Sequence, residues 1–317
     1  MRAVIYDGQN YSLNETPTPT PRADESLIRV LKTGICNTDL EIFNGYMGFR
    51  GIPGHEFVGI VEQGPKEWVG RRVVGEINIA DGVCDMCQRG VPSQCRHRTT
   101  LGIDRHNGTF ADYVTLVTRN LHSVPENVSD DQAVFVEPLA AALDVATAGE
   151  ITARDNVVLI GAGKLGLLAA QALKLTGCTL SVIVRHETPA RLLARWGIHA
   201  ITLDQAARNI ASAVIDCTGN AEGFAAALDL VEPRGRIVLK STYTSLPSAD
   251  LTRVVVDEIR VIGSRCGLFP NALRALEYGE IDVESLIEAR YRLSDSLAAI
   301  AHASCPGALK ILMEAGR

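Results

Sequence analysis

The chain has 317 residues, of which 46% are hydrophobic and 21% charged, and its formal net charge is -6 at pH 7. The length predicts about two globular domains with a substantial apolar core. The acidic balance disfavours a nucleic-acid partner, because phosphate binding needs a basic face. The sequence contains no run of ~18 apolar residues, so we expect no membrane span. The N-terminus lacks the apolar core of a signal peptide, so we expect a cytoplasmic protein.

The first part of the chain predicts a mostly β unit. β-rich runs at 27–31, 57–61 and 72–75 are separated by Gly and Pro, and helical periodicity is weak there. Residues 132–148 are rich in Ala and Leu, and strands then alternate with helices. We expect strands at 156–160, 180–184, 213–216 and 236–239, and helices at 165–175, 189–196, 221–230 and 270–278. Such alternation predicts a parallel, doubly wound sheet.

The segment from Gly34 to Glu56 contains donors of three kinds, namely the Cys36 thiol, the His55 imidazole and the carboxylates of Asp39 and Glu56. Sulfur, nitrogen and oxygen donors suit zinc, and three protein ligands leave a fourth position open for water or substrate. The pattern therefore predicts a catalytic metal site. The alternative is that Cys36 is a small buried hydrophobe and His55 a capped loop histidine.

A second cluster has the spacing of a structural metal site. Cys84 and Cys87 are separated by two residues, Cys95 follows, and Asp81 precedes them. These four residues would complete a tetrahedral set, because a carboxylate oxygen is an allowed zinc ligand. His97 is a possible substitute ligand, and a lobe that has lost its metal is the alternative. The cysteines outside the two clusters predict plain core packing; they are Cys178, Cys217, Cys266 and Cys305.

The strand expected at 156–160 leads into a glycine-rich turn and then an apolar helix. The pattern Gly-x-Gly-x-x-Gly in this position predicts a dinucleotide-binding loop. Gly161 would permit the tight turn, Gly163 the close approach of the pyrophosphate, and Gly166 the packing of helix on strand. The N–H groups of the helix N-terminus favour the diphosphate. We assign the whole loop to the cofactor site: Gly161, Ala162, Gly163, Lys164, Leu165 and Gly166.

The end of the second strand bears on the choice of cofactor. An acidic residue is expected there to hold the ribose 2′-OH of NAD, but the strand ends in Arg185 and His186, and Glu187 follows late. Arg185 suits a 2′-phosphate, so we expect NADP to be preferred without excluding NAD. The alternative is that Arg185 is a solvated strand-end residue. We also assign Thr218 to the cofactor site.

In order and spacing, these motifs resemble the zinc-dependent medium-chain dehydrogenase/reductase family over nearly the whole chain. The resemblance implies a GroES-like, mostly β catalytic domain at 1–137 and 268–317 and a Rossmann domain at 138–267. Glu137, in the context Glu137-Pro138-Leu139, resembles the polyol, glucose and threonine branch, where a carboxylate replaces a cysteine of alcohol dehydrogenases. The family lobe usually holds four cysteines, so Asp81 is a departure.

The family activity implied is hydride transfer between an alcohol, polyol or sugar and NAD(P). Cys36 and His55 would hold the catalytic zinc, with Glu56 and Glu137 as direct or water-mediated ligands. The alternative for both glutamates is a helix-capping or loop carboxylate.

Three further residues are catalytic candidates. The Thr38 hydroxyl is a candidate proton relay, or else a strand-end residue. Asp39 is expected to orient His55, and Glu41 falls where many alcohol dehydrogenases have a relay histidine.

Two other classes remain as alternatives, a metal-free quinone or enoyl reductase on the same scaffold and a non-enzymatic nucleotide-binding relative. The partner implied is a small molecule, and the family implies a homodimer or homotetramer.

Overall fold

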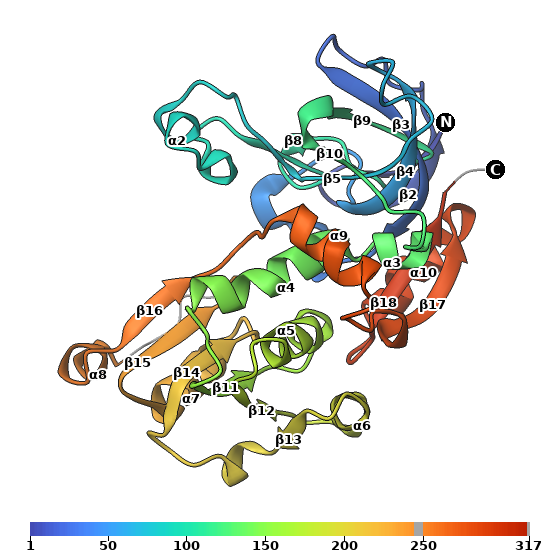
Figure 1. Ribbon diagram of the computed structural model, residues 1–317. Helices are drawn as coiled ribbons and strands as arrows, with labels where there is room; N and C mark the ends of the chain where they lie inside the picture. The colour runs from blue at the N-terminus through green and yellow to red at the C-terminus, as the bar shows by residue number, and fades with distance from the viewer. Residues whose placement is uncertain (244–249, 316–317) are drawn as a thin grey trace. The chain divides into compact units, whose positions relative to one another are not determined.

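The computed structural model describes residues 1–243 and 250–315 (Figure 1). The chain divides into two compact units, one formed by Met1–Glu137 with Ala272–Arg317 and the other by Pro138–Asn271. Among the described residues, no helix has the length and apolar character needed to cross a membrane.

The first unit is built on a seven-stranded sheet. Its strands are β3 (Glu25–Gly34), β4 (Glu56–Gln63), β5 (Arg72–Gly75), β9 (Tyr113–Val117), β10 (Leu121–Ser123), β17 (Ile287–Arg292) and β18 (Lys310–Glu314). Neighbouring strands follow the order β10-β5-β4-β3-β18-β17, and β9 pairs with β3. β18 runs antiparallel to β3 with Leu312 opposite Gly34. The C-terminal strands β17 and β18 thus belong to the same sheet as β3, β4 and β5.

Smaller elements surround this sheet in the first unit. A two-stranded sheet pairs β1 (Arg2–Tyr6) with β2 (Tyr11–Glu15), and a three-stranded sheet contains β6 (Asn78–Ile79), β7 (Thr99–Leu101) and β8 (Arg105–His106). The helices are α1 (Asn37–Phe43), α2 (Asp85–Gln88), α3 (Asp130–Ala133), α9 (Phe269–Glu277, which begins in the other unit) and α10 (Ser296–Ala303). Single 3-10 turns lie at Tyr46–Gly48, Pro92–Gln94, Thr118–Asn120, Glu284–Leu286 and Leu293–Asp295. The segment that carries α2 projects from the unit as a lobe (Figure 1).

The second unit is a parallel sheet whose strands are mostly connected by helices along the chain (Figure 1). The strands are β11 (Asn156–Ile160), β12 (Thr179–Ile183), β13 (His199–Ile201), β14 (Ala211–Asp216), β15 (Val231–Leu239) and β16 (Arg260–Gly263). The helices are α4 (Val136–Ala148), α5 (Lys164–Lys174), α6 (Glu187–Arg195), α7 (Ala221–Leu230) and α8 (Leu251–Val256), with a 3-10 turn at Leu203–Gln205. The strand order β13-β12-β11-β14-β15-β16 reverses direction between β11 and β14. Doubly wound folds bind ligands outside the carboxyl ends of the strands at such a reversal.

Phe110 organises the core of the first unit around the loop that precedes β4. Its side chain is fully buried, and it packs in a cluster with Ile28, Ile35 and Leu101. Gly54 has φ +95°, and a Cβ there would lie 2.3 Å from Phe110 Cδ1. Only glycine therefore fits at position 54, and the close packing fixes the loop that carries His55.

The predicted fold class is confirmed, because one unit is mostly β and the other is built on a parallel, doubly wound sheet. The strand expected at 156–160 and the helix expected at 221–230 match β11 and α7 to the residue. Several short strands were not predicted; they are β13, β16, β17 and β18. Their runs of three to six residues are interrupted by charges or follow a turn, so the periodicity is weak.

The expectation of core packing for the scattered cysteines was wrong at one position. Cys305 is exposed, whereas Cys178, Cys217 and Cys266 are partly buried. Cys305 follows α10 in a turn, where the chain is at the surface.

Replacing Phe110 by alanine should lower the free energy of unfolding by about 3 to 5 kcal/mol, because the change leaves a cavity in a closely packed core. Urea unfolding would measure the loss. Tyr278, which is 70% exposed, offers a control truncation to alanine that we expect to change stability little. Equal losses in the two variants would contradict the importance of the packing around Gly54.

Candidate functional site

Three donors of different chemistry meet in the first unit. One ligand atom from each of Cys36, His55 and Glu56 lies within 4.8 Å of the other two. Cys36 is the residue before α1, His55 is in the loop before β4, and Glu56 is the first residue of β4. Cys36 is partly buried, whereas His55 and Glu56 are buried. The sequence prediction that these three residues lie together agrees with this arrangement.

Asp39 joins the segments that carry these donors. Its Oδ2 accepts a hydrogen bond from the Cys36 backbone N–H at 2.8 Å, and its Oδ1 accepts one from the Gly54 N–H at 3.2 Å. Oδ1 also lies 3.2 Å from His55 Nδ1, although the ring geometry is not that of a hydrogen bond. The buried carboxylate therefore fixes the start of α1 against the loop before β4, beside the imidazole.

A buried lysine from the end of the chain pairs with Glu56. Lys310, the first residue of β18, is 2% exposed and donates to Glu56 Oε2. Burial disfavours the charged lysine, but the carboxylate of Glu56 and then the nearby Cys36 and Asp39 raise its pKa above the ordinary value. A charge buried this completely needs a partner, and the ion pair supplies one.

Gly34 provides the space for this ion pair. It lies opposite Glu56 in the pairing of β3 with β4 and opposite Leu312 in the pairing with β18. A Cβ at position 34 would lie 2.5 Å from Glu56 Oε2 and 3.4 Å from Lys310 Cδ. Glycine at position 34, two residues before Cys36, is thus required by the close approach of two side chains.

The donor group fits a divalent cation. Glu56 Oε1 is buried and has no hydrogen-bond partner among the described residues, and buried polar atoms without partners are rare. Burial opposes protonation of His55, but Asp39 and Cys36 together raise its pKa well above the ordinary value. Both observations indicate a pocket with surplus negative charge, and thiolate, imidazole and carboxylate donors are those that zinc accepts.

The other residues predicted for this site do not belong to the group of three donors. Thr38 Oγ1 lies 3.7 Å from Cys36 Sγ, next to the donors. Glu41 is partly buried in α1. Glu137 is partly buried in the first turn of α4, and among the described residues it is not in the group whose ligand atoms all lie within 4.8 Å. The roles of these three residues stay predictions.

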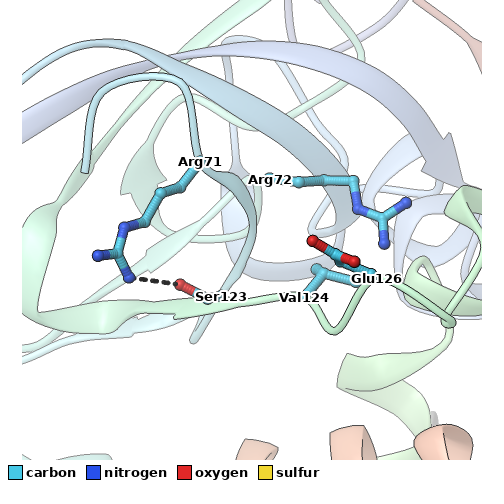
Figure 2. Close-up of a pocket in the computed structure, with 5 residues that line it drawn as sticks. All are labelled: Arg71, Arg72, Ser123, Val124 and Glu126. Carbon is cyan, nitrogen blue, oxygen red and sulfur yellow. Dashed lines mark hydrogen bonds between the residues drawn. The ribbon is translucent and has the colours of Figure 1, made fainter. Parts of the chain in front are cut away.

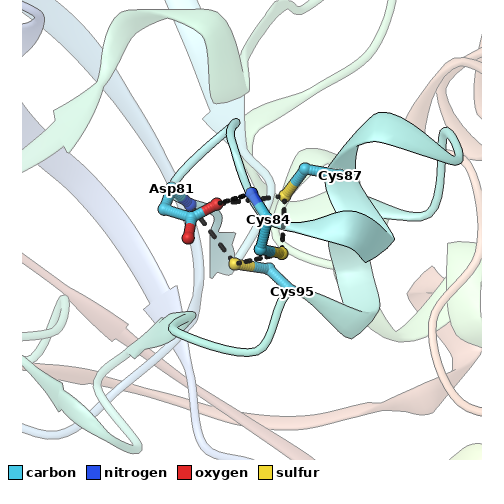
Figure 3. A group of neighbouring side chains, drawn as sticks. All are labelled: Asp81, Cys84, Cys87 and Cys95. Atoms are coloured by element: carbon cyan, nitrogen blue, oxygen red, sulfur yellow. Dashed lines mark hydrogen bonds between the residues drawn. The ribbon is translucent and has the colours of Figure 1, made fainter.

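The projecting lobe contains a second donor group (Figure 3). Ligand atoms of Asp81, Cys84, Cys87 and Cys95 all lie within 4.8 Å of one another. Cys84 Sγ is 3.6 Å from Cys87 Sγ and 3.7 Å from Cys95 Sγ. Backbone N–H groups of Arg96 and Cys87 lower the pKa of Cys84 to about 7. By contrast, desolvation and the thiols of Cys84 and Cys95 raise the pKa of Cys87 to about 12. The four residues named from the sequence therefore have the spacing and chemistry of a closed zinc site.

The glycines of the loop after β11 have the geometry that a dinucleotide needs. Gly161 has φ +97°, and a Cβ at Gly166 would lie 1.8 Å from the Gly161 carbonyl oxygen. Beside Gly163, the residue before α5, no atom lies within 4 Å of the Cβ position among the described residues. The N-terminus of α5 has no side-chain cap there. The loop thus combines a tight turn, close packing and an open approach to the N-terminus of α5.

The remaining residues assigned to the cofactor follow the carboxyl ends of β12 and β14, the two strands that flank β11. Arg185 and His186 are exposed and follow β12. Thr218 follows β14, and its N–H and hydroxyl both donate to Asp216 Oδ1, at 2.8 and 2.7 Å. Tyr243 Oη donates to the other oxygen of Asp216 at 2.5 Å. Asp216 therefore orders the loop that lies beside Gly161.

The first unit also contains a surface pocket of about 480 Å³ (Figure 2). Arg71, Arg72, Ser123, Val124 and Glu126 line it. The Arg72 guanidinium donates to Asp130 Oδ1 and to the carbonyls of Pro125 and Val128, so it is already bound within the fold. None of the predicted site residues lines this pocket, and we assign it no function.

The sequence did not single out Lys310 or Tyr243. Lys310 is a charged residue directly before the apolar run Ile311-Leu312-Met313, and such a residue in a buried strand predicts an ion pair. Its partner lies 254 positions away, so the sequence alone gives no way to identify Glu56. Tyr243 carries no comparable signal.

Two family models match the chain. The alcohol dehydrogenase GroES-like domain matches residues 22–126, and the zinc-binding dehydrogenase model matches residues 165–278. The chain is 30% identical to the starvation-sensing protein RspB of Escherichia coli K12, over 90% of this chain and 91% of that protein. It is 31% identical to L-threonine 3-dehydrogenase of Coxiella burnetii, over 79% of each chain. It is 28% identical to sorbitol dehydrogenase of Halalkalibacterium halodurans, over 96% and 95%.

Solved structures agree with these matches. A protein of Sinorhizobium meliloti 1021, assigned as a zinc-binding dehydrogenase and solved with NADP, is 27% identical with a TM-score of 0.91 over 99% and 98% of the two chains. The alcohol dehydrogenase RspB of Escherichia coli CFT073, solved with NADH, is 27% identical with a TM-score of 0.92 over 99% of each chain.

Replacing Lys310 by methionine should lower the free energy of unfolding by about 3 to 5 kcal/mol, because the variant leaves the Glu56 charge buried without its partner. Urea unfolding in a metal-free buffer would measure the change. Lys310→Arg should keep most of the stability, and Lys66→Met, at an exposed lysine, should be neutral. A Lys310→Met protein as stable as the parent would show that the ion pair is not needed.

Proposed function

Because the chain belongs to the zinc-dependent medium-chain dehydrogenase/reductase family, we propose that a zinc ion held by Cys36, His55 and Glu56 serves its oxidoreductase activity. Alcohol or polyol oxidoreduction with a nicotinamide cofactor is the activity of this chain that its relatives support. The observation that carries the proposal is the meeting of three zinc-type donors within 4.8 Å in the first unit.

The substrate in this proposal is a small molecule with a hydroxyl group, such as a polyol or a sugar, or the matching carbonyl compound. The names of two relatives, L-threonine 3-dehydrogenase and sorbitol dehydrogenase, support that class. We further propose that residues 1–137 with 268–317 act as the catalytic domain and residues 138–267 as the nucleotide-binding domain.

Zinc, when bound, supplies Lewis acidity toward a substrate oxygen, and the nicotinamide supplies the hydride chemistry. The residues of the chain have separate tasks. Cys36 and His55 bind the ion, and Glu56 offers the oxygen that has no other partner among the described residues. Asp39 holds the Cys36 backbone and lies against His55 Nδ1. Lys310 holds the second oxygen of Glu56 and so limits how that carboxylate turns.

Proton movement requires a hydroxyl beside the donors. Thr38 Oγ1 lies 3.7 Å from Cys36 Sγ, and a hydroxyl both donates and accepts hydrogen bonds. We propose Thr38 as the group that passes the substrate proton onward. Glu137 is the fourth residue proposed for the metal, either directly or through water, and Glu41 is a further acid on the same helix as Thr38.

The second unit supports a nicotinamide dinucleotide as the cofactor. The loop from Gly161 to Gly166 would receive the pyrophosphate at the N-terminus of α5, with Thr218 beside it. Arg185 is exposed after β12 and would bind a 2′-phosphate by a charge-assisted hydrogen bond. We propose NADP as the preferred cofactor, with NAD also accepted. Structural neighbours solved with NADP and with NADH leave both open.

A metal-free quinone or enoyl reductase on the same scaffold is the competing function. Such an enzyme has no use for a thiol, an imidazole and a carboxylate that converge in a buried site with one oxygen unpaired. Zinc content separates the two functions, and turnover of a nicotinamide cofactor separates either from a non-enzymatic relative.

Replacing Cys36 by serine should remove one zinc ion per chain and nearly all turnover, because a serine hydroxyl is a poor zinc ligand beside a thiolate. Elemental analysis and a steady-state assay with alcohols, polyols and aldoses would measure both. Dinucleotide affinity should be unchanged, since its loop lies in the other unit. Cys305→Ser, at an exposed cysteine, is the matched control. Full activity in Cys36→Ser would exclude the proposed site.

Replacing Arg185 by aspartate should weaken NADP binding by roughly tenfold or more. The variant loses a charge-assisted hydrogen bond to the 2′-phosphate and places a second negative charge beside it. The variant should bind NAD at least as well as the parent does. Titration of both cofactors by fluorescence would give the ratio of affinities. Arg195→Asp makes the same charge change at the far end of α6. An unchanged ratio in Arg185→Asp would rule out the phosphate contact.

A further inference from the structure

His97 contacts two of the four donors in the lobe without belonging to the donor group. Its ring Nδ1 lies 2.6 Å from Asp81 Oδ2, and its backbone N–H donates to Cys95 Sγ at 3.4 Å. The side chain is 73% exposed. Among the described residues, the donor group of the lobe consists of Asp81 and the three cysteines alone. His97 therefore lies next to the donor group and contacts it twice, through its ring at Asp81 and through its backbone N–H at Cys95.

The two oxygens of Asp81 have different surroundings. Oδ1 lies 3.4 Å from Cys87 Sγ, on the side of the thiols, and accepts a hydrogen bond from the Cys84 N–H at 3.1 Å (Figure 3). It also accepts one from the Val83 N–H at 2.9 Å. Oδ2 is bound by the His97 ring. An ionised carboxylate only accepts hydrogen bonds, so Nδ1 must carry the hydrogen and donate it. One oxygen thus faces the thiols, and the other is occupied.

We propose that Asp81 completes a three-thiolate, one-carboxylate zinc site through Oδ1, and that His97 is the positioning residue that holds Asp81 in this one-oxygen arrangement without binding the ion. The inference rests on the lobe holding metal, and it is independent of hydride transfer.

The chemistry of the donors explains why a carboxylate in this place needs support. Zinc–oxygen bonds of ~2.0–2.2 Å are shorter than zinc–sulfur bonds of ~2.3 Å, and structural sites are four-coordinate. A free carboxylate can turn to present either oxygen or both, which would disturb a tetrahedral set. A hydrogen bond to the outer oxygen removes that freedom. Contacts of this kind are typically worth 10- to 100-fold in metal affinity.

Backbone donors complete the support of the thiolates. The Asp81 N–H donates to Cys95 Sγ at 3.3 Å, alongside the His97 N–H. Arg96 forms an ion pair with Asp85 at 2.5 Å, in the first turn of α2. Three thiolates and a carboxylate exceed the charge of a divalent zinc ion by two negative charges. The surrounding backbone N–H groups partly offset this excess.

The test compares zinc retention in the intact protein, in three new variants and in the Cys36→Ser variant described above. Zinc per chain is measured by elemental analysis, and its transfer to a chromogenic chelator is followed over a series of chelator concentrations. His97→Phe removes the ring donor but keeps the backbone N–H to Cys95. Asp81→Asn keeps Oδ1 as an acceptor for Val83 and Cys84 but loses the charge. His199→Phe, at an exposed histidine of the other unit, is the control.

We expect two zinc ions per chain in the parent and in His199→Phe. His97→Phe should hold one of the two about tenfold more weakly, and Asp81→Asn should lose that same ion more readily still. Thermal unfolding should start at lower temperature in both. Activity measured before zinc is lost should be close to that of the parent.

Three outcomes would overturn the inference. Zinc affinity equal to the parent in His97→Phe would remove the positioning role, and equal affinity in Asp81→Asn would remove the carboxylate ligand. A parent protein with one zinc ion, lost in Cys36→Ser, would show an empty lobe and leave the proposed dehydrogenase site intact. If Asp81→Asn loses zinc and Cys36→Ser keeps all of its zinc, the result would support a zinc ion in the lobe and would exclude one at Cys36.

Discussion

The buried ion pair between Lys310 and Glu56 connects the end of the chain to the donor group near its beginning. β18 lies antiparallel to β3, the Ile35 N–H donates to the Ile311 carbonyl at 3.0 Å, and Gly34 leaves the space in which the two charges meet. Removing either partner would leave a buried charge alone, which costs far more than an exposed pair contributes. The ion pair therefore makes the geometry around Cys36 depend on the C-terminal strand.

The two donor groups differ in burial and chemistry in ways that suit different tasks. The group of Cys36, His55 and Glu56 is largely buried, has mixed donors, and keeps one carboxylate oxygen without a partner among the described residues. The lobe is thiolate-rich and has four donors on a short segment. Four protein ligands close a zinc site, whereas three leave a position open. The two groups therefore suit the proposed catalytic and structural roles, with Glu137 proposed as a further ligand of the first group, directly or through water.

Many residues of both sites could be predicted from the sequence because they lie in motifs of only a few residues. The cysteines of the lobe, the paired His55 and Glu56, and the glycines after β11 are each recognisable within a few residues. The structure explains the glycines in physical terms, since a Cβ at Gly54 would meet Phe110 and one at Gly166 would meet the Gly161 carbonyl. The short strands β13, β16, β17 and β18 were missed because too few residues carry their pattern.

The contacts that the sequence did not reveal have one property in common. Lys310, Asp216 and Lys240 each stand at the end of an apolar strand, next to runs of Val, Ile or Leu. Burying an ionised group is costly, so a lone charge in such a place predicts a partner. The partners are Glu56 for Lys310, Thr218 and Tyr243 for Asp216, and Ser264 with the Arg265 carbonyl for Lys240. All lie on other segments except Thr218, so sequence reasoning predicts that a partner exists, and only the fold identifies it.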